Sequence, residues 1–532
     1  MGLDEQLNRI RSKLKHVQEK NPQGRDPREL VLQPPLTLSQ VEQFESKHGI
    51  TLPEDFRRFV LEVGSSGFGP AYGLETLDRW FCEADAPDGI QKPAIVQPDL
   101  QAEHWWEDFG VDEDERYQGT LYIATHGCTY EILLVLNGPH RGRVVYVDLD
   151  EYTRPFFPEN QSFVSWYERW LDENLWGYDL DWFGYTVPGT EADLLRMASS
   201  AAFPVQRRCD AILSLWRLPS LRSETVQFLV DGLSETEEVA LASIQILKNL
   251  VRNLVNHFLL PVLSDQRPGV RQEAFSKIIW ANKPPGPYTL ERRALVTDPA
   301  TPQQSLDLLQ FLKDHLQDPD GKVAATAVTA LADLDQPLYS FQELRQSPHP
   351  EVRAVYLDQL GHQALQEPYT TDEQQHMWEW MLAGLEDPDA QVRNKAVSGL
   401  KTFTHQVDDP EHPPLKEVWR STSIQRLHEG FTTEPDVEVR KTILFVARYA
   451  FDLSGAQTIF LMAAQQPDLA TRQAVLSEID EAFRNGGAKP SDGFRKEPTI
   501  HQVLDLLSQG DVVVPEEQAL TLQARKLRKR CF

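Results

Sequence analysis

A thiol and an imidazole stand two positions apart in the stretch "THGC", as Cys128 and His126. If this stretch is a strand, both side chains point to the same face, where the histidine could activate the thiol as a nucleophile. Such a pair needs a third group to orient the histidine, and the sequence suggests none. Nor does the sequence contain paired carboxylates, a nucleophile elbow or a dinucleotide fingerprint. We therefore predict no enzyme activity and keep a cysteine-dependent hydrolase as an alternative.

Metal ions and cofactors are not predicted either. His104, His126 and His140 follow no spacing that a metal site would require. The cysteines are Cys82, Cys128, Cys209 and Cys531. They form no C-x-x-C pair, so we expect neither a zinc site nor a disulfide framework, and we interpret them as buried or incidental thiols.

The glycine-rich stretch "GSSGFGP" begins at Gly64. A phosphate-binding loop follows a strand, opens a helix and carries a lysine beside its serine or threonine. This stretch follows a predicted helix, has no lysine and ends in proline. We therefore expect Gly64, Gly67 and Gly69 to supply turn conformations and to bind no phosphate.

An acidic, aromatic stretch is the candidate binding site. Residues 81–120 hold 11 acidic and two basic side chains together with two adjacent tryptophans. Aromatic anchors surrounded by charge are typical of protein interfaces. The predicted partner-binding residues are Trp105, Trp106, Glu107, Asp108, Asp112, Glu113, Asp114 and Glu115. In the alternative interpretation the loop is solvated and its tryptophans pack back onto the sheet.

Helices and strands that would position these residues can be read from the pattern. Ser39 is the expected N-cap of one helix, Gly49 ends it, and Pro53 fits the first turn of the next. Two β-rich runs within 119–150 are joined by a turn at "NGPHRG". A closing helix over 162–175 places its aromatic residues on one side, and "LWGYDLDWFGY" after it is expected to pack this domain onto the first repeat.

Three passages in this order resemble the SUKH superfamily, the Smi/Knr-type domain of bacterial immunity proteins and fungal cell-wall regulators. They are "VEQFESKHGITLPEDFRRFVLEVGSSGFGP", "ATHGCTYEILLVLNGPHRGRVVYVD" and "SFVSWYERWLDE". The resemblance covers about residues 1–185. It implies an α+β fold, with a small bent sheet flanked by helices, and no catalytic role.

After about residue 190 one phrase recurs every 30 to 50 residues. Its clearest copies are "DPDGKVAATAV" at Asp318, "SPHPEVRAVYL" at Ser347, "DPDAQVRNKAV" at Asp387, "EPDVEVRKTIL" at Glu434 and "QPDLATRQAVL" at Gln466. A proline turn followed by apolar residues at helical spacing is typical of two-helix solenoid units. The region resembles HEAT-like repeats over roughly 190–510, which predicts an all-α solenoid.

The recurring Val-Arg step has a structural interpretation. We expect each valine to face the core between helices, and each arginine to reach acidic groups in its own turn or on the next unit. The arginines concerned are Arg271, Arg353, Arg393, Arg440 and Arg472. A phosphate-binding stripe is the alternative, and the acidity of the chain argues against it.

Short β-rich runs precede "TVPGTEAD", and almost unbroken helical patterning follows it, so we place a domain boundary there. The predicted domains are a SUKH-like domain over 1–187, a HEAT-like solenoid over 188–515 and a basic tail over 516–532. The tail carries five basic residues within 525–530. It is expected to dock on the acidic domain, cap the solenoid, bind an acidic partner or stay exposed.

Charge and composition limit the classes of partner. The 532 residues are 41% hydrophobic and carry a formal net charge of −27, which argues against direct nucleic-acid binding because phosphates would be repelled. No apolar run approaches the roughly 18–20 residues of a membrane span. The N-terminus shows no signal sequence, so we expect a full-length cytoplasmic protein.

Two functions remain open. The resemblance implies an immunity protein that binds a cognate toxin and occludes it, and an acidic inhibitor suits a basic toxin such as a nuclease. The alternative is a regulatory adaptor that joins partners through its solenoid and its SUKH-like domain. In both cases the predicted partner is a protein.

Overall fold

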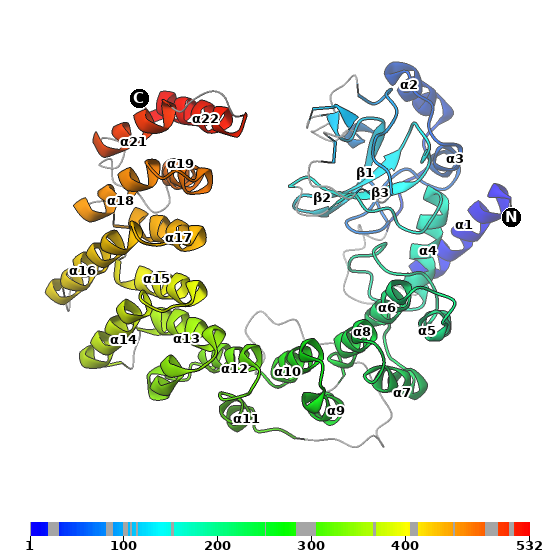
Figure 1. The fold of residues 1–532 in the computed structure, drawn as a ribbon. Helices are drawn as coiled ribbons and strands as arrows, with labels where there is room; N and C mark the ends of the chain where they lie inside the picture. The colour runs from blue at the N-terminus through cyan, green and yellow to red at the C-terminus, as the bar shows by residue number, and fades with distance from the viewer. Residues whose placement is uncertain are drawn as a thin grey trace. The chain divides into compact units, whose positions relative to one another are not determined.

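The computed structural model describes most of the chain (Figure 1). The described residues are 2–19, 31–80, 89–98, 100, 105–106, 109–112, 115–150, 154–250, 252–283, 305–364, 369–404, 413–450, 453–484, 498–509 and 515–531. They divide into two compact units, an N-terminal unit (Met1–Ser305) and a C-terminal unit (Leu306–Phe532). Within the described ranges, every helix is too short or too polar to span a membrane.

A three-stranded antiparallel sheet lies at the centre of the N-terminal domain. Its strands are β1 (Thr120–Gly127), β2 (Tyr130–Val135) and β3 (Val144–Asp148), in the order β1-β2-β3. Two register shifts interrupt the β1–β2 pairing, which is the kind of irregularity that bends a strand. The first predicted β-rich run is therefore a hairpin of two strands, because the chain reverses at Cys128 and Thr129. The turn at "NGPHRG" joins β2 to β3 as predicted.

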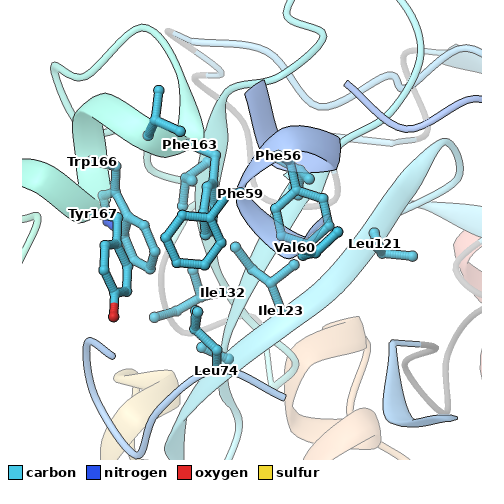
Figure 2. Packing of buried hydrophobic residues seen from close by; sticks show 14 of the residues in the cluster. Phe56, Phe59, Val60, Leu74, Leu121, Ile123, Ile132, Phe163, Trp166 and Tyr167 are labelled. Carbon is cyan, nitrogen blue, oxygen red and sulfur yellow. The ribbon is translucent and has the colours of Figure 1, made fainter. Parts of the chain in front are cut away.

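Four helices accompany the sheet, and aromatic residues fill the core between them (Figure 2). The helices are α1 (Leu3–Glu19), α2 (Leu38–His48), α3 (Glu54–Glu62) and α4 (Phe163–Leu175). Phe56 and Phe59 of α3 meet Phe163 of α4 edge to face, with ring centroids 4.7 and 5.0 Å apart. Ile123 and Ile132 belong to the same cluster. This is the expected α+β arrangement of helices on a small sheet.

The turns of this domain follow local chemistry with small differences from expectation. Thr37, rather than Ser39, caps α2, and its side chain forms a capping box with Gln40. Gly49 ends that helix in the left-handed conformation, as predicted. In the glycine-rich stretch Gly67 has φ +89°, whereas Gly64 avoids a clash with the side chain of Leu32. Close packing, and not only turn geometry, therefore requires these glycines.

From Glu191 to Asn282 the described part of the N-terminal unit is mostly helical. Its helices are α5 (Glu191–Ser199), α6 (Val205–Leu213), α7 (Ser223–Gly232), α8 (Glu237–Leu247), α9 (Arg252–Leu259) and α10 (Pro268–Asn282), with short 3-10 turns η5 (Ser214–Arg217) and η6 (Leu260–Ser264). Neighbours in the sequence pair in space, as α5 does with α6 and α7 with α8, and α6, α8 and α10 contact one another in succession. This pairing is typical of solenoid repeats.

The C-terminal unit continues the pattern. It contains α11 (Leu308–Asp314), α12 (Gly321–Asp333), η7 (Leu338–Gln346), α13 (Pro350–Gln363), α14 (Thr371–Gly384), α15 (Ala390–Thr404), α16 (Pro413–Phe431), α17 (Val437–Arg448), α18 (Ser454–Ala464), α19 (Leu469–Arg484), α21 (Pro498–Ser508) and α22 (Pro515–Cys531). Helices α13, α15, α17, α19 and α22 form one row of contacts, and α14, α16, α18 and α21 form a second (Figure 1).

Each clear copy of the recurring phrase marks the start of a helix, namely α12, α13, α15, α17 or α19. In α12 and α17 the aspartate that follows the proline, Asp320 or Asp436, caps the helix with its side chain. The valines are buried as predicted, with Val352 at 0% and Val392 at 1% exposure. The fold class is therefore an α+β domain followed by an α-solenoid, as the sequence predicts.

Candidate partner-binding surface

The two tryptophans of the predicted acidic site are buried. Trp105 is 4% exposed and Trp106 is 5% exposed, and both pack with Tyr117 on the side of the sheet opposite α3 and α4. The guanidinium of Arg116 lies 5.4 Å from the centre of the Trp106 ring. The alternative interpretation therefore describes their position correctly: they support the sheet and are not exposed anchors.

The acidic residues around them divide into two groups. Asp112 and Glu115 are described, and Glu115 forms an ion pair with Lys92 at 2.7 Å. Four more predicted binding residues, Glu107, Asp108, Glu113 and Asp114, lie outside the described residues. A role of this stretch in binding remains a prediction that rests on its charge.

A second surface, which the sequence analysis did not single out, lies where the β1–β2 hairpin turns. We call it the hairpin aromatic patch and define it by Tyr72, His126, Cys128, Tyr130, Trp182 and Tyr185. The exposed fractions are 78% for Tyr72, 47% for Trp182 and 36% for Tyr185. Exposed aromatic side chains gathered in one place are a frequent property of protein-binding surfaces.

Ring contacts hold the patch together. Trp182 stacks on His126 with ring centroids 5.5 Å apart and planes 19° apart, and Tyr130 meets Trp182 at 5.2 Å and 88°. Tyr185 stacks on Phe156 at 4.8 Å. Three segments distant in sequence thus meet, which explains why no sequence motif revealed the patch.

The backbone of the patch is unusual. Four non-glycine residues of the described chain have positive φ, and Cys128 (+52°) and Trp182 (+55°) belong to the patch, while Ala71 (+55°) precedes Tyr72. The left-handed conformation costs a residue with a Cβ roughly 1–2 kcal/mol. Such conformations persist where the surrounding structure enforces them, and they cluster at functional sites.

Negative charge lies against the patch. Asp148 of β3 pairs with Tyr130 across the sheet, and its charge is the main reason why the pKa of Tyr130 is raised. Burial, and then the charges of Tyr130 and Asp148, raise the pKa of Tyr185. Asp148 is 1% exposed; its Oδ1 accepts a hydrogen bond from Thr129, while Oδ2 has no hydrogen-bond partner among the described residues.

Comparison with known proteins identifies the domain that carries the hairpin and Tyr72 of this surface. Residues 35–169 match the family model of the SMI1 / KNR4 family (SUKH-1). This part of the chain is a SUKH-1 domain. The match is consistent with a protein-binding role like that of immunity proteins. None of the curated proteins compared matches the chain.

Similar solved structures are distant. One is an engineered protein that is 13% identical in sequence. The match covers 64% of this chain and 98% of the engineered protein, with a TM-score of 0.26. A chain of the Kap95p–RanGDP structure shares 14% identity over 69% of this chain and 48% of its own, with a TM-score of 0.37. Human deoxyhypusine hydroxylase is 15% identical in sequence. The match covers 55% of this chain and 94% of the hydroxylase, with a TM-score of 0.21. TM-scores this low support no conclusion about function.

The Cys–His pair of the SUKH-1 domain does not have the predicted geometry. His126 lies at the end of β1, but Cys128 is an exposed residue of the hairpin turn, so the two do not alternate along one strand. Burial lowers the pKa of His126, and its Nε2 has no hydrogen-bond partner among the described residues. No carboxylate therefore orients the imidazole through this atom. Among the described residues, no three His, Cys, Asp or Glu side chains gather around a metal position.

A buried ionic cluster joins the SUKH-1 domain to the first helices after it. Glu173 of α4, 1% exposed, accepts a hydrogen bond from Arg169 at 2.8 Å and lies 3.5 Å from Arg217 of η5. Burial lowers the pKa of Arg217 to about 10, and its guanidinium lies over the ring of Tyr178. The first half of "LWGYDLDWFGY" therefore packs at this junction, as expected, whereas Trp182 and Tyr185 turn to the hairpin.

Four of the five predicted arginines contact an acid of the next unit, and Arg271 donates to the carbonyl of Asp265 in its own turn, both as predicted. Arg353 donates to both oxygens of Asp387 at 2.9 Å, and Arg393 to both oxygens of Glu434 at 2.8 Å. Further pairs are Arg440 with Asp468 and Arg472 with Glu517. Burial would raise the pKa of Asp387, but the hydrogen bonds from Arg353 and the backbone of Asp389, together with the charges of Arg353 and Arg393, lower it. These guanidinium groups are engaged in stacking the repeats, which disfavours the phosphate stripe.

The basic tail belongs to the last helix. Arg528 of α22 forms an ion pair with Asp505 of α21 at 2.8 Å, and Arg525 donates to the carbonyl of Ser508 at 3.2 Å. Leu520 and Leu527 are buried in the same helix. Among the four expectations for the tail, these contacts favour a cap on the solenoid. The predicted limits of the three domains remain predictions.

Proposed function

We propose that this chain is a non-enzymatic immunity protein that binds a cognate toxin and occludes it. The observation that carries the proposal is the SUKH-1 match over residues 35–169, which is consistent with an immunity-like, protein-binding role. The exposed aromatic side chains on that domain and on the segment after it support the proposal, because aromatic residues are enriched in the energetic centres of protein interfaces.

Charge suggests the chemistry of the toxin. With a formal net charge of −27, the chain attracts a basic protein and speeds the encounter, and salt weakens this attraction. A nuclease needs a basic surface to hold its phosphate backbone, so a nuclease toxin fits the proposal. Inhibition by occlusion requires no chemistry from the immunity protein itself.

A regulatory adaptor is the second candidate, and one feature of the C-terminal unit favours it. A cavity of about 400 Å³ opens between repeats. Its wall includes the apolar residues Leu385, Val397 and Ile443, and its charged residues include the pair Arg393 and Glu434. A cavity of this size accommodates one or two side chains of a bound peptide. In this function the repeats, rather than the SUKH-1 domain, bind the principal partner.

A pull-down with the tagged full chain from its native cell, followed by mass spectrometry, tests the proposal. We expect one basic protein at one-to-one stoichiometry, released when the salt concentration is raised. Co-expression should then protect cells from that protein. Recovery of several housekeeping or signalling proteins, with no toxic one among them, would favour the adaptor and contradict immunity.

A further inference from the structure

We propose that the hairpin aromatic patch is the receptor for an arginine side chain of the partner protein. This inference rests on the proposed function and specifies where and how the partner is recognised. The guanidinium group stacks on Trp182, and the carboxylates beside the patch balance its charge.

The aromatic part of the receptor is already in place. Trp182 rests on His126 at 5.5 Å and keeps 47% of its surface exposed, while Tyr130 and Tyr185 lie 5.2 and 5.8 Å from it. A cation within about 6 Å of such rings is attracted by their electron-rich faces. Because burial lowers the pKa of His126, the imidazole below the indole is neutral at pH 7 and does not repel the cation.

The charged residues near the patch are mostly acidic. The segments that form the patch and its rim are 70–75, 123–132, 144–150, 154–156 and 176–185. They contain one basic residue, Arg154. Asp148 and Asp150 lie at the end of β3, and Asp179 and Asp181 shortly precede Trp182 in the chain. Glu75 and Glu131 lie beside Tyr122, on the other side of the sheet. An excess of carboxylates around exposed aromatic rings favours a cationic group over an anion or an apolar side chain.

Asp148 supplies a buried negative charge next to the rings. It is 1% exposed, and its Oδ1 accepts hydrogen bonds from the hydroxyl of Thr129 and the backbone N–H of Asp150. Its effect on the pKa values of Tyr130 and Tyr185 places its charge beside the rings of the patch.

The patch calls for a group that stacks on aromatic rings and carries a positive charge toward carboxylates. A guanidinium group does both better than an ammonium group. It is planar, so it stacks on an indole, and it presents several N–H donors in a fork that suits carboxylates. An ammonium group is more strongly hydrated and does not stack. The receptor is therefore expected to prefer arginine over lysine at equal charge.

The experiment is ¹⁹F NMR of the full chain labelled with 5-fluorotryptophan, titrated with a hexaarginine peptide. The spectrum of Trp182→Phe assigns the resonance of Trp182. We expect this resonance to move and saturate, and we expect hexalysine to bind more weakly and hexaglutamate to leave it unchanged. Trp176, 44% exposed in the same segment, is the matched reference resonance.

Two variants complete the test. Asp150→Asn removes an exposed charge whose backbone N–H bonds to Asp148, and it should weaken hexaarginine binding about five-fold. Trp176→Ala should leave the affinity unchanged. The inference is overturned if Trp182 moves no more than Trp176, if Asp150→Asn binds as tightly as the parent chain, or if hexalysine binds as well as hexaarginine. Failure of the pull-down overturns the proposed function separately, since the titration does not depend on the captured partner.

Discussion

The SUKH-1 domain and the repeats of the C-terminal unit bury their charges in different ways. In the domain, Glu168 on α4 accepts hydrogen bonds from Gln6 and Arg9 and pairs with Lys13, residues more than 150 positions away. In the repeats, Arg353 and Arg393 each pair with an acid 34 or 41 positions later, on the following unit. The first arrangement forms only when the whole domain folds, whereas the second repeats one rule between neighbours.

The two regions also differ in how often a non-glycine residue adopts a positive φ. Three of the four non-glycine residues with positive φ in the described chain lie in the N-terminal unit, and Asp335 alone lies in the C-terminal unit. A repeat array adds up similar neighbour contacts and has little need of strained turns. Backbone strain in the SUKH-1 domain is concentrated around an exposed aromatic patch, which is where a partner site would require fixed side chains.

The largest effect that would sharpen this comparison is expected for Glu173→Gln. The change leaves Arg169 and Arg217 buried without their carboxylate, and breaking a buried ionic cluster costs about 3–5 kcal/mol. Urea unfolding of the full chain, followed by fluorescence, measures the loss. Glu224→Gln, an exposed acid at 71% side-chain exposure, is the control and should change stability little. Equal stability of the two variants would contradict a stabilising role for the cluster.

A smaller effect is expected for Arg353→Met in the repeats. The substitution removes two charge-assisted hydrogen bonds to Asp387 and should cost about 1–3 kcal/mol in the C-terminal unit. A double-mutant cycle with Asp387→Asn measures the coupling between the two side chains. Arg196→Ala, whose side chain is 75% exposed, is the matched control. Additive single changes would show that the repeats do not stack through this pair.

Acid provides a third test, confined to the SUKH-1 domain. Burial would raise the pKa of Glu168, but hydrogen bonds from Arg9, Lys13 and Gln6 lower it to about 2. Because the folded pKa lies below the unfolded value near 4.5, the stabilising contribution is complete above pH 4.5 and is lost as the pH falls toward 2. The stability difference between the parent chain and Glu168→Gln should shrink over that window. A difference independent of pH would contradict the assignment.

The smallest effect on stability is expected for Trp182→Gly. Glycine adopts a φ of +55° without strain, and this relief offsets the lost contacts with His126 and Tyr130. We therefore expect a change in the free energy of unfolding within about 1 kcal/mol. Thermal unfolding measures it, beside Trp176→Gly, where φ is −77° and no strain is relieved. A much larger loss in Trp182→Gly would mean that Trp182 is a structural residue of the domain.

Much of the fold could be predicted because its signals are local. The Val-Arg phrase marks helix starts correctly, since capping, proline turns and apolar spacing act within a few residues. Gly49 and the "NGPHRG" turn were predicted for the same reason. The hairpin turn at Cys128 was missed, because "YIATHGCTYEILL" reads as one continuous β-rich run.

The position of the two tryptophans was predicted less well. Trp105 and Trp106 looked like anchors because acidic residues surround them in sequence, yet both are covered by the sheet and by Tyr117. Sequence neighbours report charge density, but they do not report which face of a loop packs inward.

The amino-acid sequence by itself therefore determined the two architectures, the helix starts, the acidity and the family resemblance, all of which depend on short-range patterns and composition. Only the tertiary structure decided that Tyr72, His126 and Trp182 form one surface and that Glu173 lies between two arginines. Apart from Arg169 and Glu173, which are neighbours on α4, these residues are tens of positions apart. Their contacts exist only after the sheet, α4 and the segment after it have packed together.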